Sequence, residues 1–369
     1  MKRFILLFYI ALSSLSVSLA QSAYINRVYE YRPAPGQFIN TMPEYSDGDT
    51  EESMTQKAED CIADHTQTMI CLGGFGGYVV FGFDHTIENV SGHYDFTVLG
   101  NAFYSNSANL TDTCGGSAEP GIVFVSRDDN GNGLPDDKWY EIAGSEYYKA
   151  TTKHNITITY HRPDAGHVAT PDPSYRFITD TSYVAWNTSD GLSGYVYKNS
   201  FHSQNYYPDW IEADELSLTG TLLPNNAVDL STNGTNFLLY CLGYGYCDNH
   251  PNTDDRSKFN IEWAVDDDGN HVSLDGIDFV KVQTGLNQYA GWLGETRTEV
   301  ADAWDLHLTG GDDVDVYYEP ESSSAVRRIQ NSTSQRIVYD MLGRKVSDTS
   351  RSGMYLIVEN GMTRKIIVH

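Results

Sequence analysis

Short runs of β-branched and aromatic residues, separated by polar loops, recur along most of this chain. Alternation with a period of two residues is typical of β-strands, and no segment shows the long apolar stripe of an amphipathic helix. We therefore predict an all-β protein with a β-sandwich (jelly-roll-like) body and a small β-rich C-terminal domain. The predicted strands span residues 77–83, 94–99, 121–126, 155–160, 195–197, 215–218 and 277–282, and turn-rich segments span 40–60, 104–120, 163–182 and 223–257.

The N-terminus has the pattern of a secretory signal peptide. Lys2 and Arg3 are followed by the apolar stretch 4–12, and Ser18-Leu-Ala20 provides a small-residue cleavage site. We therefore predict a signal peptide at residues 1–20. No other stretch approaches the roughly 18 apolar residues that a transmembrane helix needs, so no transmembrane span is predicted.

Charge narrows the range of partners. The chain carries 24 basic and 50 acidic residues, a formal net charge of −26. Phosphate backbones and anionic membrane surfaces would repel such a protein, so nucleic-acid binding is not expected. Clustered carboxylates instead suit hard cations such as Ca²⁺.

The five cysteines are Cys61, Cys71, Cys114, Cys241 and Cys247. An exported protein can form disulfides, and the pairs closest in sequence are Cys61/Cys71 and Cys241/Cys247. The sequence does not choose among the possible connectivities. The Cys241-x₅-Cys247 spacing lacks a partner motif for zinc, and no neighbouring motif supports a catalytic thiol at Cys114.

A calcium loop is predicted directly after the strand 121–126. Short oxygen-bearing side chains alternate from Asp128 and a glycine follows at Gly133, as at positions 1, 3, 5 and 6 of an EF-hand loop. Trp139 stands where the EF-hand has its bidentate Glu, and the alternative is a solvated hairpin turn. The predicted ligands are Asp128, Asn130, Asn132, Leu134 (through its carbonyl), Asp136 and Asp137.

A second acidic loop precedes the strand 277–282. Its glycine, Gly269, sits early for the same metal-binding register, so an acidic turn is an equal alternative. The predicted metal ligands are Asp266, Asp268, Asn270 and Asp275.

The segment Phe201–Trp210 concentrates aromatic and amide side chains. Aromatic faces stack on sugar rings or flat ligands while amides supply directional hydrogen bonds. The alternative is burial in the core of the sandwich. The predicted ligand-binding residues are His202, Gln204, Tyr206, Tyr207, Trp210 and Trp186.

Catalytic motifs are missing from the sequence. HExxH and GxSxG with partners are absent, and the glycine-rich stretch 72–78 precedes a strand rather than a phosphate-binding helix. We assign no catalytic residue. A glycoside hydrolase that uses two carboxylates stays open, because their separation is spatial. The glutamates considered for it are Glu88, Glu119, Glu141, Glu212 and Glu262.

The segments 72–85, 119–126, 128–144, 201–210 and 274–281 together resemble an uncharacterised family of bacterial cell-surface (PKD-like) proteins from gut-type bacteria of the Bacteroidota. The resemblance spans about residues 25–310. Relatives are similar in context to surface proteins encoded beside TonB-dependent transporters, some concerned with corrinoid uptake. The resemblance therefore implies ligand capture at the cell surface, by association only.

The C-terminus resembles the sorting domain of the type IX secretion system. The resemblance rests on Ile337–Val346, on the Gly-x-Tyr-Leu-Ile strand in 353–361, and on the basic-aliphatic end Thr363–His369. It implies that the type IX secretion machinery carries the protein to the cell surface. The alternative is a small terminal β domain in an ordinary secreted protein.

The sequence thus predicts a β-sandwich ligand-binding body at 21–318, a linker at 319–326 and a sorting domain at 327–369. The preferred interpretation is a secreted or cell-surface, non-catalytic protein. Structural Ca²⁺ would stabilise it, and it would capture a glycan or small molecule such as a corrinoid. The alternatives are an extracellular carbohydrate hydrolase and an adhesin that binds another protein.

Overall fold

A computed structural model of the protein describes residues 21–105, 114–231 and 233–313, and four strands between residues 337 and 368. The chain divides into two compact units, Met1–Glu321 and Ser322–His369. The predicted signal peptide (1–20) and linker (319–326) lie outside the described residues. None of the helices in the described part of the chain has the length and apolar character that a bilayer crossing requires.

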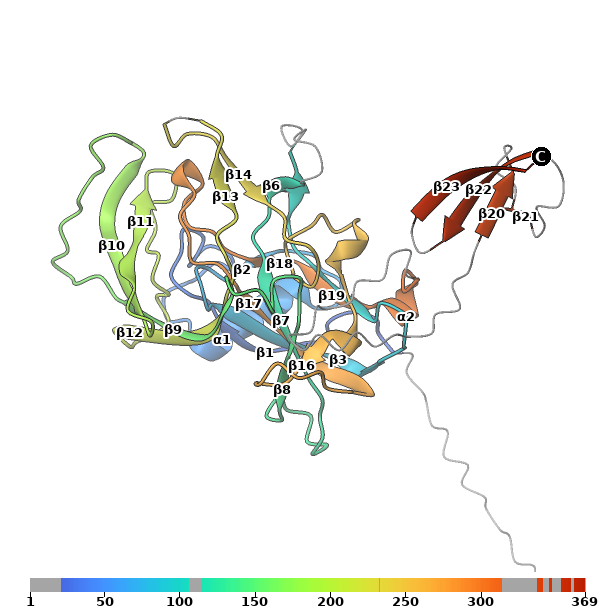
Figure 1. Cartoon of the computed structure of the whole chain (residues 1–369). Coiled ribbons are helices and arrows are strands. Elements are labelled where there is room, and N and C mark those ends of the chain that lie inside the picture. The colour runs from blue at the N-terminus through green and yellow to red at the C-terminus, as the bar shows by residue number, and fades with distance from the viewer. Residues whose placement is uncertain are drawn as a thin grey trace, which may run out of the picture. The chain divides into compact units, whose positions relative to one another are not determined.

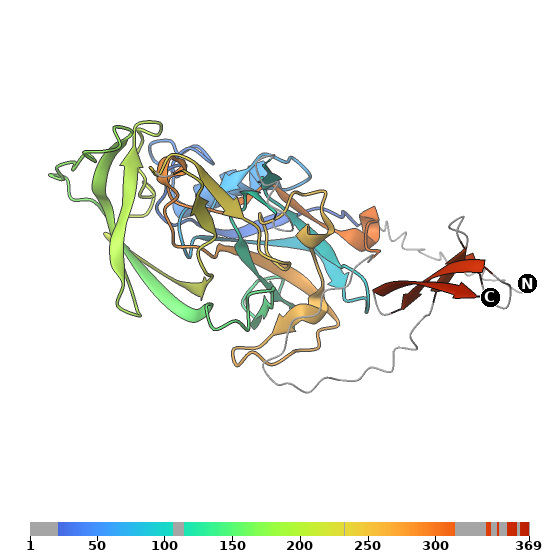
Figure 2. The ribbon, with the colours of Figure 1, turned by 45° about the horizontal axis from the view of Figure 1, so that its top comes forward.

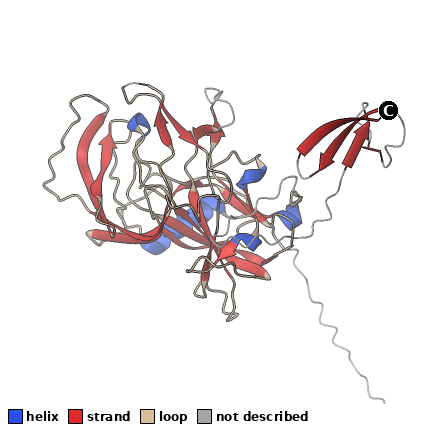
Figure 3. Ribbon diagram, viewed as in Figure 1, coloured by secondary structure: helices blue, strands red, loops and turns tan. Residues whose placement is uncertain are grey.

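Strands dominate the described residues, so the predicted β class is confirmed (Figure 3). Each of the seven predicted strands coincides with an observed strand in whole or in part. The strands of the larger unit divide among five small antiparallel sheets rather than two facing ones. The jelly-roll form therefore stays a prediction.

The largest sheet has six strands, and β17 at its centre pairs with β3 and β7. Val280 and Val282 of β17 are fully buried, since the sheet is covered by other parts of the unit. The strand order is β1 (Arg27–Arg32), β3 (Tyr78–Glu88), β17 (Gly276–Thr284), β7 (Gly121–Ser126), β8 (Trp139–Ile142) and β16 (Ala264–Val265).

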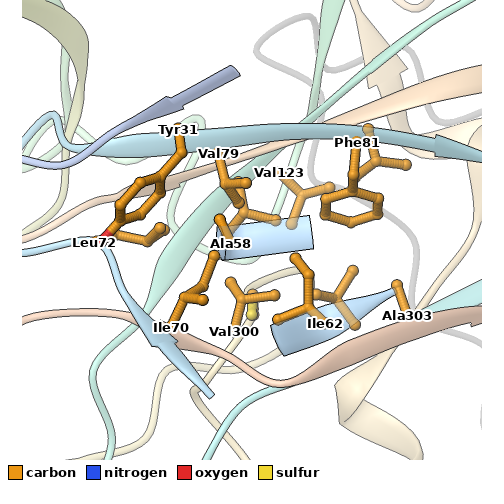
Figure 4. Close-up of a cluster of buried hydrophobic side chains, with 14 of the residues drawn as sticks. Tyr31, Ala58, Ile62, Ile70, Leu72, Val79, Phe81, Val123, Val300 and Ala303 are labelled. Atoms are coloured by element: carbon orange, nitrogen blue, oxygen red, sulfur yellow. The ribbon is translucent and has the colours of Figure 1, made fainter. Parts of the chain in front are cut away.

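The helix α1 (Glu51–Ile62) lies in a segment that the sequence analysis assigned to turns, so that assignment is wrong here. Thr50 and Ser53 form a reciprocal capping box that satisfies backbone N–H groups of the first turn. Met54, Ala58 and Ile62 are fully buried. Figure 4 shows Ala58 and Ile62 among core residues of the strands, including Val79, Phe81 and Val123.

A four-stranded sheet forms one end of the larger unit, drawn in green in Figures 1 and 2. Its order is β11 (Ser193–Asn199), β10 (Ile178–Thr188), β9 (Lys153–His161) and β12 (Glu215–Leu222). The start of β10 lies in the predicted turn segment 163–182. The inner face of this sheet carries Ile158, Tyr160, Leu216 and Leu218, all buried.

Three smaller sheets complete the larger unit. The first is β13 (Ala227–Asp229), β14 (Phe237–Tyr240), β6 (Gly115–Ser117) and β5 (Phe103–Tyr104). The second is β15 (Lys258–Phe259), β4 (Phe96–Leu99) and β19 (Asp302–Asp305), and the third is β18 (Glu299–Val300) with β2 (Ile70–Cys71). The helical turns are α2 (Leu306–Thr309), η2 (Asp255–Ser257), η3 (Ile261–Trp263) and η4 (Gly291–Leu293).

The C-terminal unit contains an antiparallel four-stranded sheet, which agrees with a small β-rich terminal unit. Its strand order is β21 (Lys345–Val346), β20 (Ile337–Asp340), β22 (Gly353–Glu359) and β23 (Met362–Val368). The hairpin β22–β23 pairs Gly353 with Val368 and Glu359 with Met362.

Candidate functional site

A pocket of about 180 Å³ opens between the sheet β11-β10-β9-β12 and the loop that follows β17. Its walls are mainly aromatic, and Glu295 is the one carboxylate among its described lining residues. We call it the aromatic pocket. The aromatic residues that line it are Phe75, Tyr160, Trp186, Tyr195, Tyr197 and Tyr289.

The sheet fixes one wall of the aromatic pocket through its register. Trp186 of β10 lies opposite Tyr160 of β9 on one side and Gly194 of β11 on the other. A Cβ atom at Gly194 would lie 2.5 Å from Cζ2 of Trp186, so the indole ring occupies the space that glycine leaves. The Tyr160 hydroxyl donates to the carbonyl of Phe75 at 2.9 Å. The wall is therefore held in place by packing and by a buried hydrogen bond.

The loop after β17 supplies the opposite wall and the floor. It doubles back on itself, so that Tyr289 and Glu295 form an isolated antiparallel bridge. The Tyr289 ring packs on Tyr197 of β11, with ring centroids 4.8 Å apart. Glu295 and Thr296 thereby reach the pocket from a segment almost 100 residues beyond β11.

Two polar atoms in the lining of this pocket lack hydrogen-bond partners. Glu295 is 7% exposed, and its Oε1 accepts a 2.6 Å hydrogen bond from the backbone N–H of Gln37. Its Oε2 is buried without a partner among the described residues, and so is Oγ1 of Thr296. Buried polar atoms are almost always paired, with protein, ligand or ordered water. Unpaired atoms beside an open volume therefore indicate groups that a bound molecule would satisfy.

The ionisation of Glu295 follows from its surroundings. Burial raises the pKa of Glu295 to about 7, against the opposing effect of the Arg297 guanidinium and the Gln37 N–H. Near neutral pH the carboxyl group can therefore both donate and accept hydrogen bonds.

A buried acidic cluster supports this floor. Carboxylate oxygens of Glu119, Asp248 and Glu299 lie within 4.8 Å of one another. Arg297 Nε donates to Glu299 Oε1 at 2.8 Å, and Nη1 lies 3.7 Å from Glu119 Oε1 and 3.3 Å from the Glu295 carbonyl oxygen. Burial raises the pKa of Glu119 to about 8 and also raises the pKa values of Glu299 and Asp248. Arg297 thus binds the acidic cluster to the backbone that carries Glu295.

A second pocket, of about 190 Å³, lies beside residues 219–221 of β12. Its lining includes Trp139, Glu141, His154 and Lys281. The Thr221 hydroxyl donates to Glu141 Oε2 at 2.7 Å. Burial nevertheless raises the pKa of Glu141 to about 8, while Thr221 and Lys281 oppose the shift. We call it the Glu141 pocket.

The predicted aromatic surface at Phe201–Trp210 is wrong for Tyr206, Tyr207 and Trp210, whose rings are in the core, whereas Phe201 is exposed. Tyr206 and Tyr207 are fully buried and Trp210 is 6% exposed. The Tyr207 hydroxyl donates to the carbonyl of Ala213 at 3.0 Å, and Trp210 stacks on Tyr31. These rings stabilise the fold and do not line either pocket.

The other three predicted ligand-binding residues differ in their positions. His202 is half-buried with its ring 4.4 Å from that of Phe38, and Gln204 donates from Nε2 to the carbonyl of Gln37. Neither lines the aromatic pocket, although both steady the segment that holds Glu295. Trp186 does line it, and its role in ligand binding stays a prediction.

The first predicted metal loop brings its oxygen-bearing side chains together. Asp128 accepts hydrogen bonds from the N–H groups of Asn132 (3.0 Å) and Gly133 (2.8 Å), as the first residue of a tight loop does. The amides of Asn130 and Asn132 both donate to Asp136, at 2.9–3.3 Å. Asp137 lies beside them, its Oδ2 3.5 Å from the Asn130 backbone nitrogen, and Leu134 is exposed. The oxygens of Asn130 and Asn132 accept from the backbone N–H groups of Asn132 and Leu134, so the Ca²⁺ site stays a prediction.

The second predicted metal loop does not gather its four oxygens. Asp266 accepts from the N–H groups of Asp268 (3.0 Å) and Asn270 (2.8 Å), which closes a turn. Asp275 has a 94% exposed side chain and lies 3.5 Å from Arg127. The segment forms an acidic turn, and the metal site predicted there stays a prediction.

Comparison of the sequence with protein-family models and with curated proteins finds no match. The geometry of the molecule therefore carries the functional argument.

Proposed function

We propose that this protein is a non-catalytic binding protein that captures a small, ring-shaped, hydroxylated ligand, such as one sugar residue of a glycan, in the aromatic pocket. One observation carries the proposal: Glu295 and Thr296 line an aromatic-walled cavity, and each has one buried side-chain oxygen without a partner. Hydroxyl groups of a bound ring would supply the missing hydrogen bonds, while the rings of the walls would cover its apolar face.

The size of the pocket limits the ligand. A volume of about 180 Å³ is smaller than the ~300–1,000 Å³ of pockets for drug-sized molecules. It suits a single sugar ring better than a corrin macrocycle. The formal net charge of −26 further favours a neutral ligand over an anionic one.

A thermal-shift screen of the purified protein against monosaccharides, oligosaccharides and corrinoids tests this proposal. A sugar that raises the unfolding temperature of the wild type, and does so less in Glu295→Gln, would support it. A corrinoid response with no sugar response, or no response to any compound, would contradict it.

We further propose that the 128–137 loop binds Ca²⁺ as a structural ion. Asp128, Asn130, Asn132 and Asp136 would contribute side-chain oxygens, and Leu134 a carbonyl. The ion would neutralise the clustered carboxylates and stiffen the turn between β7 and β8. Calorimetric titration with CaCl₂ tests this, and a flat titration would rule out the site.

The C-terminal unit and the N-terminus are the basis of a third proposal, export to the cell surface by the type IX secretion machinery. Its support is the sequence resemblance of residues 327–369 together with the signal-peptide pattern at 1–20. In a host with this pathway, deletion of 327–369 should leave the protein in the periplasm. Unchanged surface display of the truncated protein would refute the proposal.

A second candidate function is carbohydrate hydrolysis in the Glu141 pocket. The observation that favours it is that two carboxyl groups line this pocket: Glu141, whose pKa is raised to about 8, and Asp266, whose pKa is lowered chiefly by hydrogen bonds from Asn270. Such divergent pKa values are typical of a general acid beside an ionised carboxylate. Release of reducing sugar that is lost in Glu141→Gln would establish this function.

A further inference from the structure

Three side chains outside both pockets bring soft metal ligands together. Cys114, Cys241 and His250 come from three separate segments, yet Sγ, Sγ and a ring nitrogen lie within 4.8 Å of one another. All five cysteines of the chain are free thiols, and the pairing Cys241/Cys247 suggested by the sequence is not formed. Cys247 is instead buried, with its Sγ 3.9 Å from the carbonyl oxygen of Glu299.

The ladder between β6 and β14 positions the two sulfurs. Gly115 pairs with Tyr240, and the ladder continues with a 3.0 Å hydrogen bond from the Cys241 N–H to the Cys114 carbonyl. Residues opposite one another in an antiparallel pair place their side chains on the same face. The two thiols therefore face the same side of the sheet.

His250 uses one ring nitrogen, Nε2, for hydrogen bonds to backbone carbonyl oxygens. Its Nε2 lies 2.7 Å from the carbonyl oxygens of both Leu242 and Gly243, so Nε2 must carry the proton. Its Nδ1, with a free lone pair, lies 4.0 Å from Cys114 Sγ. The Tyr104 hydroxyl is 3.0 Å from Nδ1 and 2.6 Å from Asp254 Oδ2, and we assign its single proton to the carboxylate because this contact is shorter and charge-assisted. His250 is 1% exposed, so water does not replace the missing donor.

This arrangement is common for metal-binding histidines, whose second nitrogen usually donates to a carbonyl that orients the ring. We propose that Cys114, Cys241 and His250 bind a soft divalent cation of the Zn²⁺ type through Sγ, Sγ and Nδ1. Three protein ligands leave a fourth tetrahedral position for an exogenous ligand.

The surrounding charges are compatible with this site. Arg256 is the nearest cation, with Nη1 3.6 Å from Cys114 Sγ, and it is paired with Asp254 at 2.7 Å. Two thiolates balance the charge of a divalent ion. Binding must displace thiol protons, so the affinity should rise with pH.

Titration of the reduced full-length protein with Co²⁺ tests the site, because thiolate ligands give charge-transfer bands that oxygen ligands do not. We expect these bands in the wild type, and we expect them to disappear when Zn²⁺ displaces Co²⁺. The affinity for Co²⁺ should be at least roughly tenfold weaker in Cys114→Ser and in Cys241→Ser. Cys61→Ser, outside the cluster, is the matched control and should bind as the wild type does.

X-ray absorption of the Zn²⁺-loaded wild type avoids any folding defect of a variant. We expect two sulfur ligands at about 2.3 Å and one nitrogen at about 2.0–2.1 Å. A first shell of oxygen alone, or charge-transfer bands that Cys61→Ser weakens equally, would overturn the assignment. So would a Cys114–Cys241 disulfide in the protein as isolated. The site shares no residue with the aromatic pocket, so the two proposals fail independently.

Discussion

Replacing Arg297 with Met should destabilise the protein in a pH-dependent way. The guanidinium contacts Glu299 at 2.8 Å and Glu119 at 3.7 Å, and its side chain is only 14% exposed. Removing one partner of a buried ion pair typically costs about 3–5 kcal/mol, since a buried charge stays uncompensated. We expect a loss of this size at pH 8. At pH 5 Glu119, whose pKa is raised to about 8, is largely protonated, so the loss should shrink by about 1.4 kcal/mol for each unit by which Arg297 lowers the pKa of Glu119.

Urea denaturation followed by tryptophan fluorescence measures this effect, because all six tryptophans lie in the larger unit. Arg27→Met is the matched control. Arg27 is exposed and stacks on Tyr29, and its loss should change the free energy of unfolding by less than about 0.5 kcal/mol at either pH. Equal losses for Arg297→Met at pH 5 and pH 8, or a loss below about 1 kcal/mol, would refute the role assigned to Arg297.

Three further predictions concern stability. The wild type should unfold at a lower temperature at pH 8 than at pH 5. Glu295 and Glu119 have pKa values raised to about 7 and 8, so the stability they contribute below pH 4.5 is lost as pH rises through those values; an increase over this range would contradict it. Addition of CaCl₂ to the chelator-treated protein should raise the unfolding temperature of the wild type but not of Asp136→Asn, whereas Asp268→Asn should respond as the wild type does. Ile62→Ala should cost about 2–5 kcal/mol in urea denaturation, against less than about 0.5 kcal/mol for the exposed control Gln56→Ala.

The sequence predicted strands well because their pattern is local. In β7 and β17, apolar residues with strong strand propensity run between turn residues. The helix α1 was missed because its buried face is a single line of residues, Met54, Ala58 and Ile62, four apart. Thr50 and Ser53, with Glu51 and Glu52 between them, are a helix-start signal that could have revealed it.

The aromatic pocket was predictable only in part. Trp186 was named, but Glu295 and Thr296 were not, since these positions meet only through the pairing of β9, β10 and β11 and the return of the loop after β17. Residue type alone also gave a wrong position for Tyr206 and Tyr207, which were predicted at a binding surface and lie in the core. A run of aromatics suits a binding face and a core equally, and only the tertiary structure shows which occurs.

The central claim is that the aromatic pocket binds a sugar ring against Trp186. Isothermal titration of the protein with its best saccharide from the screen, in wild type, Trp186→Ala and Trp292→Ala, tests it directly. Trp292 is 47% exposed in η4 and does not line the pocket. We predict an affinity loss of roughly tenfold, about 1.4 kcal/mol, in Trp186→Ala and none in Trp292→Ala. Undiminished binding in Trp186→Ala, or an equal loss in both variants, would contradict the account.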